Sequence, residues 1–275
     1  QYEIMQVLAR DAIENDPFSG RAFSDLARTF ENATDLARRN GQPEAAETYA
    51  RTFAAHAQQA LDRDPLNLGT RRMLGLARYK LGRTLADQNR HTDAVPAYET
   101  ALVVLTDASD RDPDDIELRK DMMRAAYRLG ISARRSDDAQ KARLSFERAV
   151  AAAQPVAEAG ALNTGDRNLV TFALNNLAAM AYDEQQGGRM VAYAETAVVI
   201  LGEKPFLLAR QHARGLALNG AYDDALDVLR GAMKPYLSQP TLTSAAQREF
   251  DELERLEAEY ESQLEQQPGF DEPVP

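Results

Sequence analysis

The side chains that most often carry out chemistry in proteins are few in this sequence and lie far apart. The chain has no cysteine and only three histidines, His56, His91 and His212, no two of which are close in sequence. A metal site needs several convergent ligands, and a nucleophile needs a neighbouring base. Neither pattern occurs, and there is no glycine-rich phosphate loop. The sequence therefore predicts a protein that is not an enzyme and that holds no metal or cofactor.

Charge is distributed unevenly along the 275 residues. The net charge is −11, but residues 241–275 hold ten acidic and two basic side chains, which leaves −3 for the first 240 residues. A phosphate backbone attracts proteins that present a dense basic stripe. The sequence therefore predicts a protein or peptide partner and no nucleic acid.

Apolar residues occur in short runs. No run approaches the roughly 18 residues of a transmembrane helix, so no membrane insertion is expected. The N-terminus also lacks the basic start and apolar core of a signal peptide. Because Gln1 is not a methionine, we expect that a signal peptide, a membrane anchor or a domain preceded it. A soluble protein of the cytoplasm or of the periplasm is compatible with the absence of cysteine.

Asp-Pro pairs recur along the chain at equal spacing, as Asp16-Pro17, Asp64-Pro65 and Asp112-Pro113. Proline resists continuation of a helix and moves the preceding residue out of helical geometry, so each pair is expected to follow the end of a helix. A fourth pair would fall at Ala161, where none exists. A fixed period of this size, about 48 residues, is typical of a repeat array, in which neighbouring units form an extended surface.

The same period aligns apolar and small side chains. Within each unit three positions are spaced four and then three apart, which places them on one stripe of a helix. The three columns are Ala46, Ala94, Ala142 and Met190; Ala50, Tyr98, Phe146 and Ala194; and Phe53, Ala101, Ala149 and Ala197. Upstream lie Leu81-Gly82, Leu129-Gly130 and Leu177-Ala178, followed by Leu85, Ala133 and Ala181. The small residue beside each leucine is expected to let a second helix approach closely, which predicts helical hairpins.

Turn signals separate the two helices of each predicted hairpin. They are Asn40–Pro43, His91–Asp93, Ser136–Asp138 and Gly187-Gly188. Thr92 and Ser136 are predicted to cap the helices that follow, because their hydroxyl oxygens can accept from unpaired amides.

This arrangement resembles the tetratricopeptide repeat (TPR). The best unit reads Leu81-Gly82…Leu85…Ala94…Tyr98…Ala101, and the resemblance covers about residues 20–236. A last unit, with Ala225, Leu229 and Ala232, is similar to the family's second helix. The step from Met190 to Ala225 is near the family's usual period of about 34 residues. The longer period of the earlier units adds close to four turns, at about 3.6 residues each. HEAT-type repeats have a similar long period, but the Leu-Gly and Ala-aromatic-Ala columns favour TPR packing.

The resemblance implies an all-α fold, a right-handed superhelical solenoid of TPR-like helical hairpins with a C-terminal capping helix. We expect residues 1–16 to be the second helix of an incomplete repeat, with Ile4, Val7, Leu8 and Ala12 on its apolar side. The array is expected over 17–240, with units at about 17–64, 65–112, 113–160, 161–202 and 203–240. An acidic capping helix over 241–267 and a flexible tail over 268–275 follow. The inner face of the capping helix is predicted to carry Ala246, Phe250, Leu253, Leu256, Tyr260 and Leu264.

In TPR arrays the first helices of successive units line a concave groove. The resemblance implies groove positions at Tyr79, Lys80, Arg83, Arg124, Tyr127, Arg128, Arg134, Asn175, Asn176, Tyr182, Arg210 and Arg214. Guanidinium groups pair bidentately with carboxylates, and tyrosines add apolar area with a hydroxyl group. We therefore expect an acidic peptide in the groove. The alternative is that these arginines are helix-face residues bonded to acidic neighbours.

The predicted function is that of a non-catalytic protein-binding or peptide-binding scaffold or adaptor. Similar long units accompany kinase-like or protease-like domains, which implies the interaction part of a larger bacterial signalling protein. The alternative is an oligomerisation module that acts through the terminal helices, residues 2–15 and 241–267. A further hypothesis is that the acidic C-terminal segment occupies the basic groove, in the same molecule or in a neighbour.

Overall fold

The structure is a computed structural model that describes residues 7, 11, 20–239 and 241–266. Those residues form helices and connecting turns, and the described part of the chain contains no strand. The chain divides into two compact units, residues 1–162 and 163–275. Apart from Val7 and Asp11, the expected helix over residues 1–16 lies outside the described residues, as does the expected tail over 268–275.

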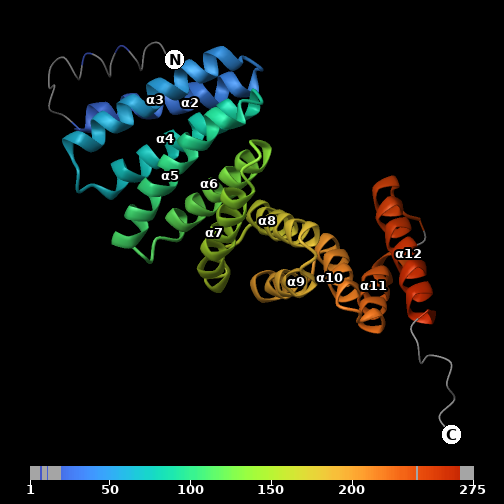
Figure 1. Cartoon of the computed structure of the whole chain (residues 1–275). Coiled ribbons are helices and arrows are strands. Elements are labelled where there is room, and N and C mark those ends of the chain that lie inside the picture. The colour runs from blue at the N-terminus through green and yellow to red at the C-terminus, as the bar shows by residue number, and fades with distance from the viewer. Residues whose placement is uncertain (1–6, 8–10, 12–19, 240, 267–275) are drawn as a thin grey trace, which may run out of the picture. The chain divides into compact units, whose positions relative to one another are not determined.

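The first unit contains three helical hairpins. Helix α2 (Gly20–Arg39) packs on α3 (Pro43–Arg63), α4 (Leu68–Asp87) on α5 (His91–Arg111), and α6 (Ile116–Arg135) on α7 (Ala139–Glu158). Successive hairpins pack through α3 with α4 and through α5 with α6 (Figure 1). The first helices begin at residues 20, 68 and 116, and the second helices at 43, 91 and 139.

The second unit contains two more hairpins and a final helix. Helix α8 (Thr164–Asp183) packs on α9 (Gly187–Leu201), and α10 (Phe206–Leu218) packs on α9 and on α11 (Tyr222–Leu237). Helix α12 (Ser244–Glu265) packs on α11. Helices α9 and α10 have 15 and 13 residues, against 20 in α8. The helices shorten in the part of the chain where the sequence period also becomes shorter.

Two helices end where the Asp-Pro pairs predict, but the predicted caps are wrong. Helices α3 and α5 end directly before Asp64 and Asp112. Thr92 lies inside α5, which begins at His91, and Ser136 directly follows the last residue of α6. Side-chain caps come instead from Asn67, Asp115, Asp138, Asn163 and Thr243, whose oxygens accept amide hydrogen bonds of 2.8–3.2 Å.

The hairpin turns share one backbone geometry. One residue per turn is left-handed: Gly41, Asn89, Asp137 and Gln185, with φ of 66°, 58°, 59° and 56°. The residue after the left-handed one donates its amide to the carbonyl five residues earlier in the chain. In the turn at Gln185, for example, the amide of Gln186 donates to the carbonyl of Ala181 at 2.8 Å. This hydrogen bond is typical of a helix that ends in a left-handed residue. Because a left-handed conformation costs non-glycine residues about 1 kcal/mol, three of these turns are strained.

The core of each hairpin confirms the predicted columns. All twelve column residues have no exposed surface. A Cβ atom built on Gly82 would lie 2.9 Å from the Tyr98 ring, and one built on Gly130 would lie 2.7 Å from the Phe146 ring. The glycine beside each leucine is therefore what lets the aromatic ring of the second helix pack against the first.

Gly187 has a different role from the predicted one. It is the first residue of α9 rather than part of the turn, and a Cβ atom built on it would lie 2.5 Å from the carbonyl oxygen of Gly215 in α10. The missing side chain therefore lets α9 and α10 approach each other closely.

Helix α12 covers the end of the second unit, as a capping helix does. Leu253, Leu256 and Tyr260 are buried against the apolar side chains of α10 and α11, and Phe250 and Leu264 are partly buried there. The acidic residues of α12 lie mainly on its exposed face. The predicted inner face is confirmed at these five positions, and Ala246 is half-buried.

Candidate functional site

In the first unit, Lys80 is held by carboxylates of the preceding first helix. Its ammonium nitrogen lies 3.0 Å from Glu31 and 2.5 Å from Asp35, both on α2. Its side chain is only 15% exposed. Lys80 therefore links α2 to α4, and its charge is largely compensated within the unit.

A second link joins α4 to α6. Arg72 donates from Nε to Asp121 at 2.7 Å, and Arg124 lies 3.5 Å from the same carboxylate. Asp121 is buried, and burial raises its pKa while the hydrogen bond from Arg72 lowers it. Sequence reasoning identified Arg124 but missed Arg72 and Asp121, which are far apart in the chain. Arg134 is exposed in the last turn of α6.

Arg83 and Arg128 are placed differently from these paired cations. Neither makes an ion pair among the residues that the structure describes, and both are half-buried. Both guanidinium groups are close enough to the phenol of Tyr98 to act on its ionisation. Burial raises the pKa of Tyr98, and the two arginines oppose that shift. The two cations stand on successive first helices, Arg83 on α4 and Arg128 on α6.

Tyrosine rings surround this pair of arginines. The rings of Tyr79 and Tyr98 are 5.9 Å apart, and the guanidinium of Arg128 lies 5.9 Å from the ring of Tyr127. The Tyr98 hydroxyl is buried and has no hydrogen-bond partner in the described structure. The two half-buried cations and the half-buried rings of Tyr79 and Tyr127 suit a carboxylate beside an apolar group, whereas Tyr98 has no exposed surface. We call Tyr79, Arg83, Tyr98, Tyr127 and Arg128 the Arg83–Arg128 cluster.

In the second unit, a glutamate of the chain already occupies the predicted arginine pair. Arg210 donates to Glu252 of α12 at 2.6 Å, and Arg214 lies 3.3 Å from the other oxygen of that carboxylate. The guanidinium of Arg214 also lies 5.7 Å from the ring of Tyr182. The acidic C-terminal helix thus places one carboxylate on the predicted basic residues.

The two predicted asparagines are engaged by their own unit. Asn175 accepts from Gln211 at 3.2 Å, and Asn176 donates to the carbonyl of Phe172, one turn earlier on α8, at 2.7 Å. These bonds use side-chain groups that could otherwise hold a peptide.

The histidines have separate environments. His56 stacks on Phe30 at 5.6 Å, His91 lies 3.5 Å from the hydroxyl of Ser132, and buried His212 contacts Lys204. Among the described residues, no group of three or more His, Cys, Asp or Glu side chains could hold a metal ion. Nor is any described helix long and apolar enough to cross a membrane.

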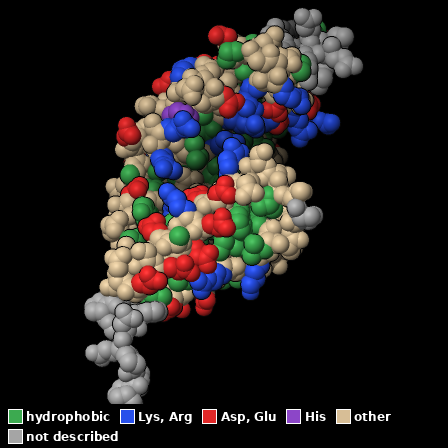
Figure 2. All heavy atoms as spheres, turned by 90° about the vertical axis from the view of Figure 1, so that its right-hand side faces the viewer, with side chains coloured by type: hydrophobic (Ala, Val, Ile, Leu, Met, Phe, Trp, Pro, Cys, Tyr) green, Lys and Arg blue, Asp and Glu red, His purple; other side chains and the backbone are tan. Residues whose placement is uncertain are grey.

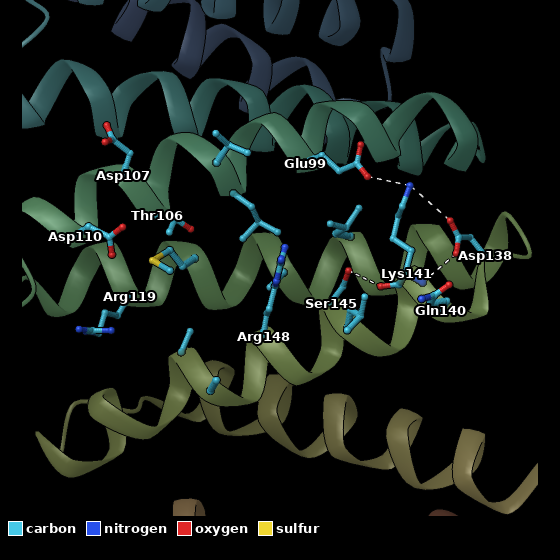
Figure 3. A pocket seen from close by; sticks show the side chains of 18 residues that line it. Glu99, Thr106, Asp107, Asp110, Arg119, Asp138, Gln140, Lys141, Ser145 and Arg148 are labelled. Atoms are coloured by element: carbon cyan, nitrogen blue, oxygen red, sulfur yellow. Dashed lines mark hydrogen bonds and ion pairs between the residues drawn. The ribbon is translucent and has the colours of Figure 1, made fainter. Parts of the chain in front are cut away.

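The structure also contains a groove that sequence reasoning missed. It has a volume of about 1000 Å³ and lies in the first unit, with α6 as its floor and α5 and α7 as its walls (Figure 3). Its apolar lining includes Leu102, Val103, Met122, Ala126 and Leu144. We call it the α5–α7 groove. On the face in Figure 2, both acidic and basic side chains of the described residues are exposed.

Each unit is built of TPR-like helical hairpins packed as in a helical solenoid. No family model matches the chain, and no curated protein matches it in sequence. Among solved structures, it is similar to BtubC (BKLC) from P. vanneervenii, with 17% identity, 88% of this chain and 93% of that chain covered, and a TM-score of 0.53. A second similar structure is the MamA protein, with 18% identity, coverage of 79% and 97%, and a TM-score of 0.50. A third is MamA 41-end from Desulfovibrio magneticus RS-1, with 18% identity, coverage of 78% and 97%, and a TM-score of 0.50. At these identities the likeness shows the fold alone.

Proposed function

We propose that this chain is a long-period TPR-like scaffold that binds an acidic segment of a partner protein on its first helices. The proposal rests chiefly on one observation, the pair Arg83 and Arg128. Their neighbours Lys80, Arg72 and Arg124 are all bonded to carboxylates, whereas these two make no ion pair among the described residues. Half-buried guanidinium groups without an anion favour a ligand that supplies one.

The second unit offers an internal example of the same recognition. Glu252 is held by two arginines from one first helix, beside the ring of Tyr182. The Arg83–Arg128 cluster likewise has two arginines and tyrosine rings, while Asp87, whose charge also acts on Tyr98, is bonded to Arg38. An aspartate or glutamate flanked by an aromatic or aliphatic residue would supply the carboxylate and cover the rings.

Peptide binding would test this proposal. An array of short fluorescent peptides, each with an Asp or Glu beside an apolar residue, would be titrated with the full chain and with Arg83→Glu/Arg128→Glu. Charge-assisted hydrogen bonds contribute about 1.5–3 kcal/mol each. The double variant should therefore bind the peptide that the wild type binds most tightly at least roughly 10-fold more weakly than the wild type does. Arg248→Glu, which reverses an exposed charge on α12, is the control. Equal binding by the two variants would refute the proposal.

Self-association through the terminal helices is the second candidate function. One observation favours it: Val7, on the apolar side predicted for residues 2–15, is 56% exposed. An exposed aliphatic side chain on an amphipathic segment is available to another molecule. Light scattering over a range of concentrations tests it, because a monomer at every concentration would contradict it.

A further inference from the structure

The α5–α7 groove has a small residue on its α6 floor. At whole repeat periods along the chain, Ala126 is equivalent to Phe30, Arg78 and Leu174. Ala126 itself is buried, so the exposed apolar surface of the groove comes mainly from its α5 and α7 walls.

The lining of the groove combines apolar side chains with three charges that have no ion-pair partner in the described structure. Val103 and Leu144, on facing walls, are 70% and 50% exposed. Lys141 is bonded to Glu99 and Asp138 at one end (Figure 3). The three charges are Arg148 on α7, Asp110 on α5, and Arg119 on α6, which donates to the carbonyl of Pro113. Such a groove suits an amphipathic helix whose polar side carries both signs of charge.

The chain itself contains a segment with this chemistry. Residues 2–15 place Ile4, Val7, Leu8 and Ala12 on one helical side, and carry acidic and basic side chains elsewhere. A helix of that length would extend about 21 Å, and the α7 residues that line the groove, Lys141 to Ala152, extend about 17 Å. The exposed Val7 and the exposed Val103 and Leu144 all belong to the first unit.

We propose that the α5–α7 groove binds residues 2–15 of a second copy of this chain. In a two-fold dimer each copy gives one segment and receives one, so the apolar contact forms twice. In charge, the acidic residues of the segment complement Arg148 and Arg119, and its one basic residue complements Asp110. This inference deepens self-association, the second candidate function, and is independent of the Arg83–Arg128 cluster.

A peptide of residues 1–17 is the probe. Labelled with fluorescein, it would be titrated with the full chain while anisotropy is measured, and the mass of the full chain would be followed by light scattering. Leu144→Glu places a charge on the α7 wall, at a side chain that is 50% exposed, so the fold should tolerate it. Val103→Glu places a charge on the wall. Each variant should weaken peptide binding at least about 10-fold and shift the chain toward monomer.

Two control variants make the result specific. Val199→Glu changes a 76% exposed valine at the equivalent position of α9 and should bind the peptide like the wild type. Arg83→Glu/Arg128→Glu should also keep binding it. Loss of binding in that double variant would place the acidic peptide on the first helices and overturn the inference, while supporting the proposed function. Failure of the peptide to bind the wild type, or equal binding by Leu144→Glu and the wild type, would overturn it as well.

Discussion

The contact between Gly130 and Phe146 leads to the sharpest prediction for stability. The Phe146 ring has no exposed surface, and a Cβ atom at position 130 would lie 2.7 Å from two of its carbon atoms. In ordinary packing, carbon atoms approach to about 3.5–4.0 Å. Gly130→Ala must therefore force a buried ring or a whole helix to move.

The expected magnitude follows from two opposing effects. Replacing glycine by alanine inside a helix stabilises it by about 1 kcal/mol. Overpacking a core typically costs about 1–3 kcal/mol, and a ring held on all sides belongs at the upper end. Gly130→Ala should therefore lower the free energy of unfolding by about 2 kcal/mol, a drop in Tm of about 4–8 °C.

Gly231→Ala is the matched control. Gly231 lies inside α11, and a Cβ atom there would meet nothing within 4 Å. It should therefore stabilise by about 1 kcal/mol, the opposite sign. Thermal and urea denaturation followed by circular dichroism would measure both variants. An increase in Tm for Gly130→Ala as large as that for Gly231→Ala would refute the reasoning.

A second mutation tests the cause. In the next hairpin the equivalent pair is Ala178 and Ala194, both buried. Phe146→Ala alone should cost about 3–5 kcal/mol by leaving a cavity. Once the ring is gone, Gly130→Ala no longer clashes, so in that background it should stabilise. If Gly130→Ala destabilised both backgrounds equally, the ring contact would not be its cause.

Three further predictions concern a turn, a cap and a histidine. Gln185→Gly should raise the free energy of unfolding by about 0.5–1 kcal/mol, because Gln185 is left-handed with φ of 56°. A lower free energy of unfolding, measured by urea denaturation, would contradict this. Glu252→Gln leaves Arg210 and Arg214 without their anion, so α12 should be cut faster in limited proteolysis, and an unchanged rate would contradict the capping role. Burial, and the nearby charge of Lys204, lower the pKa of His212; the resulting stability is complete above about pH 6.5 and is lost as pH falls toward the lower folded pKa. The drop in Tm from pH 7.5 to pH 5.5 should therefore be smaller in His212→Gln, and an equal drop would contradict it.

The buried face of each hairpin could be predicted because packing repeats with the sequence. Tyr98 and Phe146 sit opposite Gly82 and Gly130, so a large residue is paired with a small one at a constant step. Helix starts were harder to predict. Thr92 has the right chemistry for a cap but lies inside α5. The position of the turn is marked instead by the left-handed residue Asn89, two residues before the helix begins.

Ion pairs between first helices could be predicted only in part, because they depend on which residues of two neighbouring first helices lie side by side. Lys80 and Asp35 are 45 residues apart, and Arg72 and Asp121 are 49 apart, both close to one period. An acid about one period from a base is therefore a sequence signal for a link between first helices. Arg128 has Lys80 and Asn176 at that distance, and so lacks such an acid.

The repeat period of the sequence explains both features that the proposals use. Arg83 has Asp35 one period before it, but Lys80 already holds that carboxylate. Ala126 has larger side chains at the equivalent positions of α2, α4 and α8, and its helix α6 forms the floor of the α5–α7 groove. In a repeat array, the residues that stay similar at equivalent positions of successive repeats form the packed core. A residue that differs from its equivalents in the other repeats can leave a charge or a cavity that a partner fills. Departures within a column are therefore where binding surfaces should be sought in such a sequence.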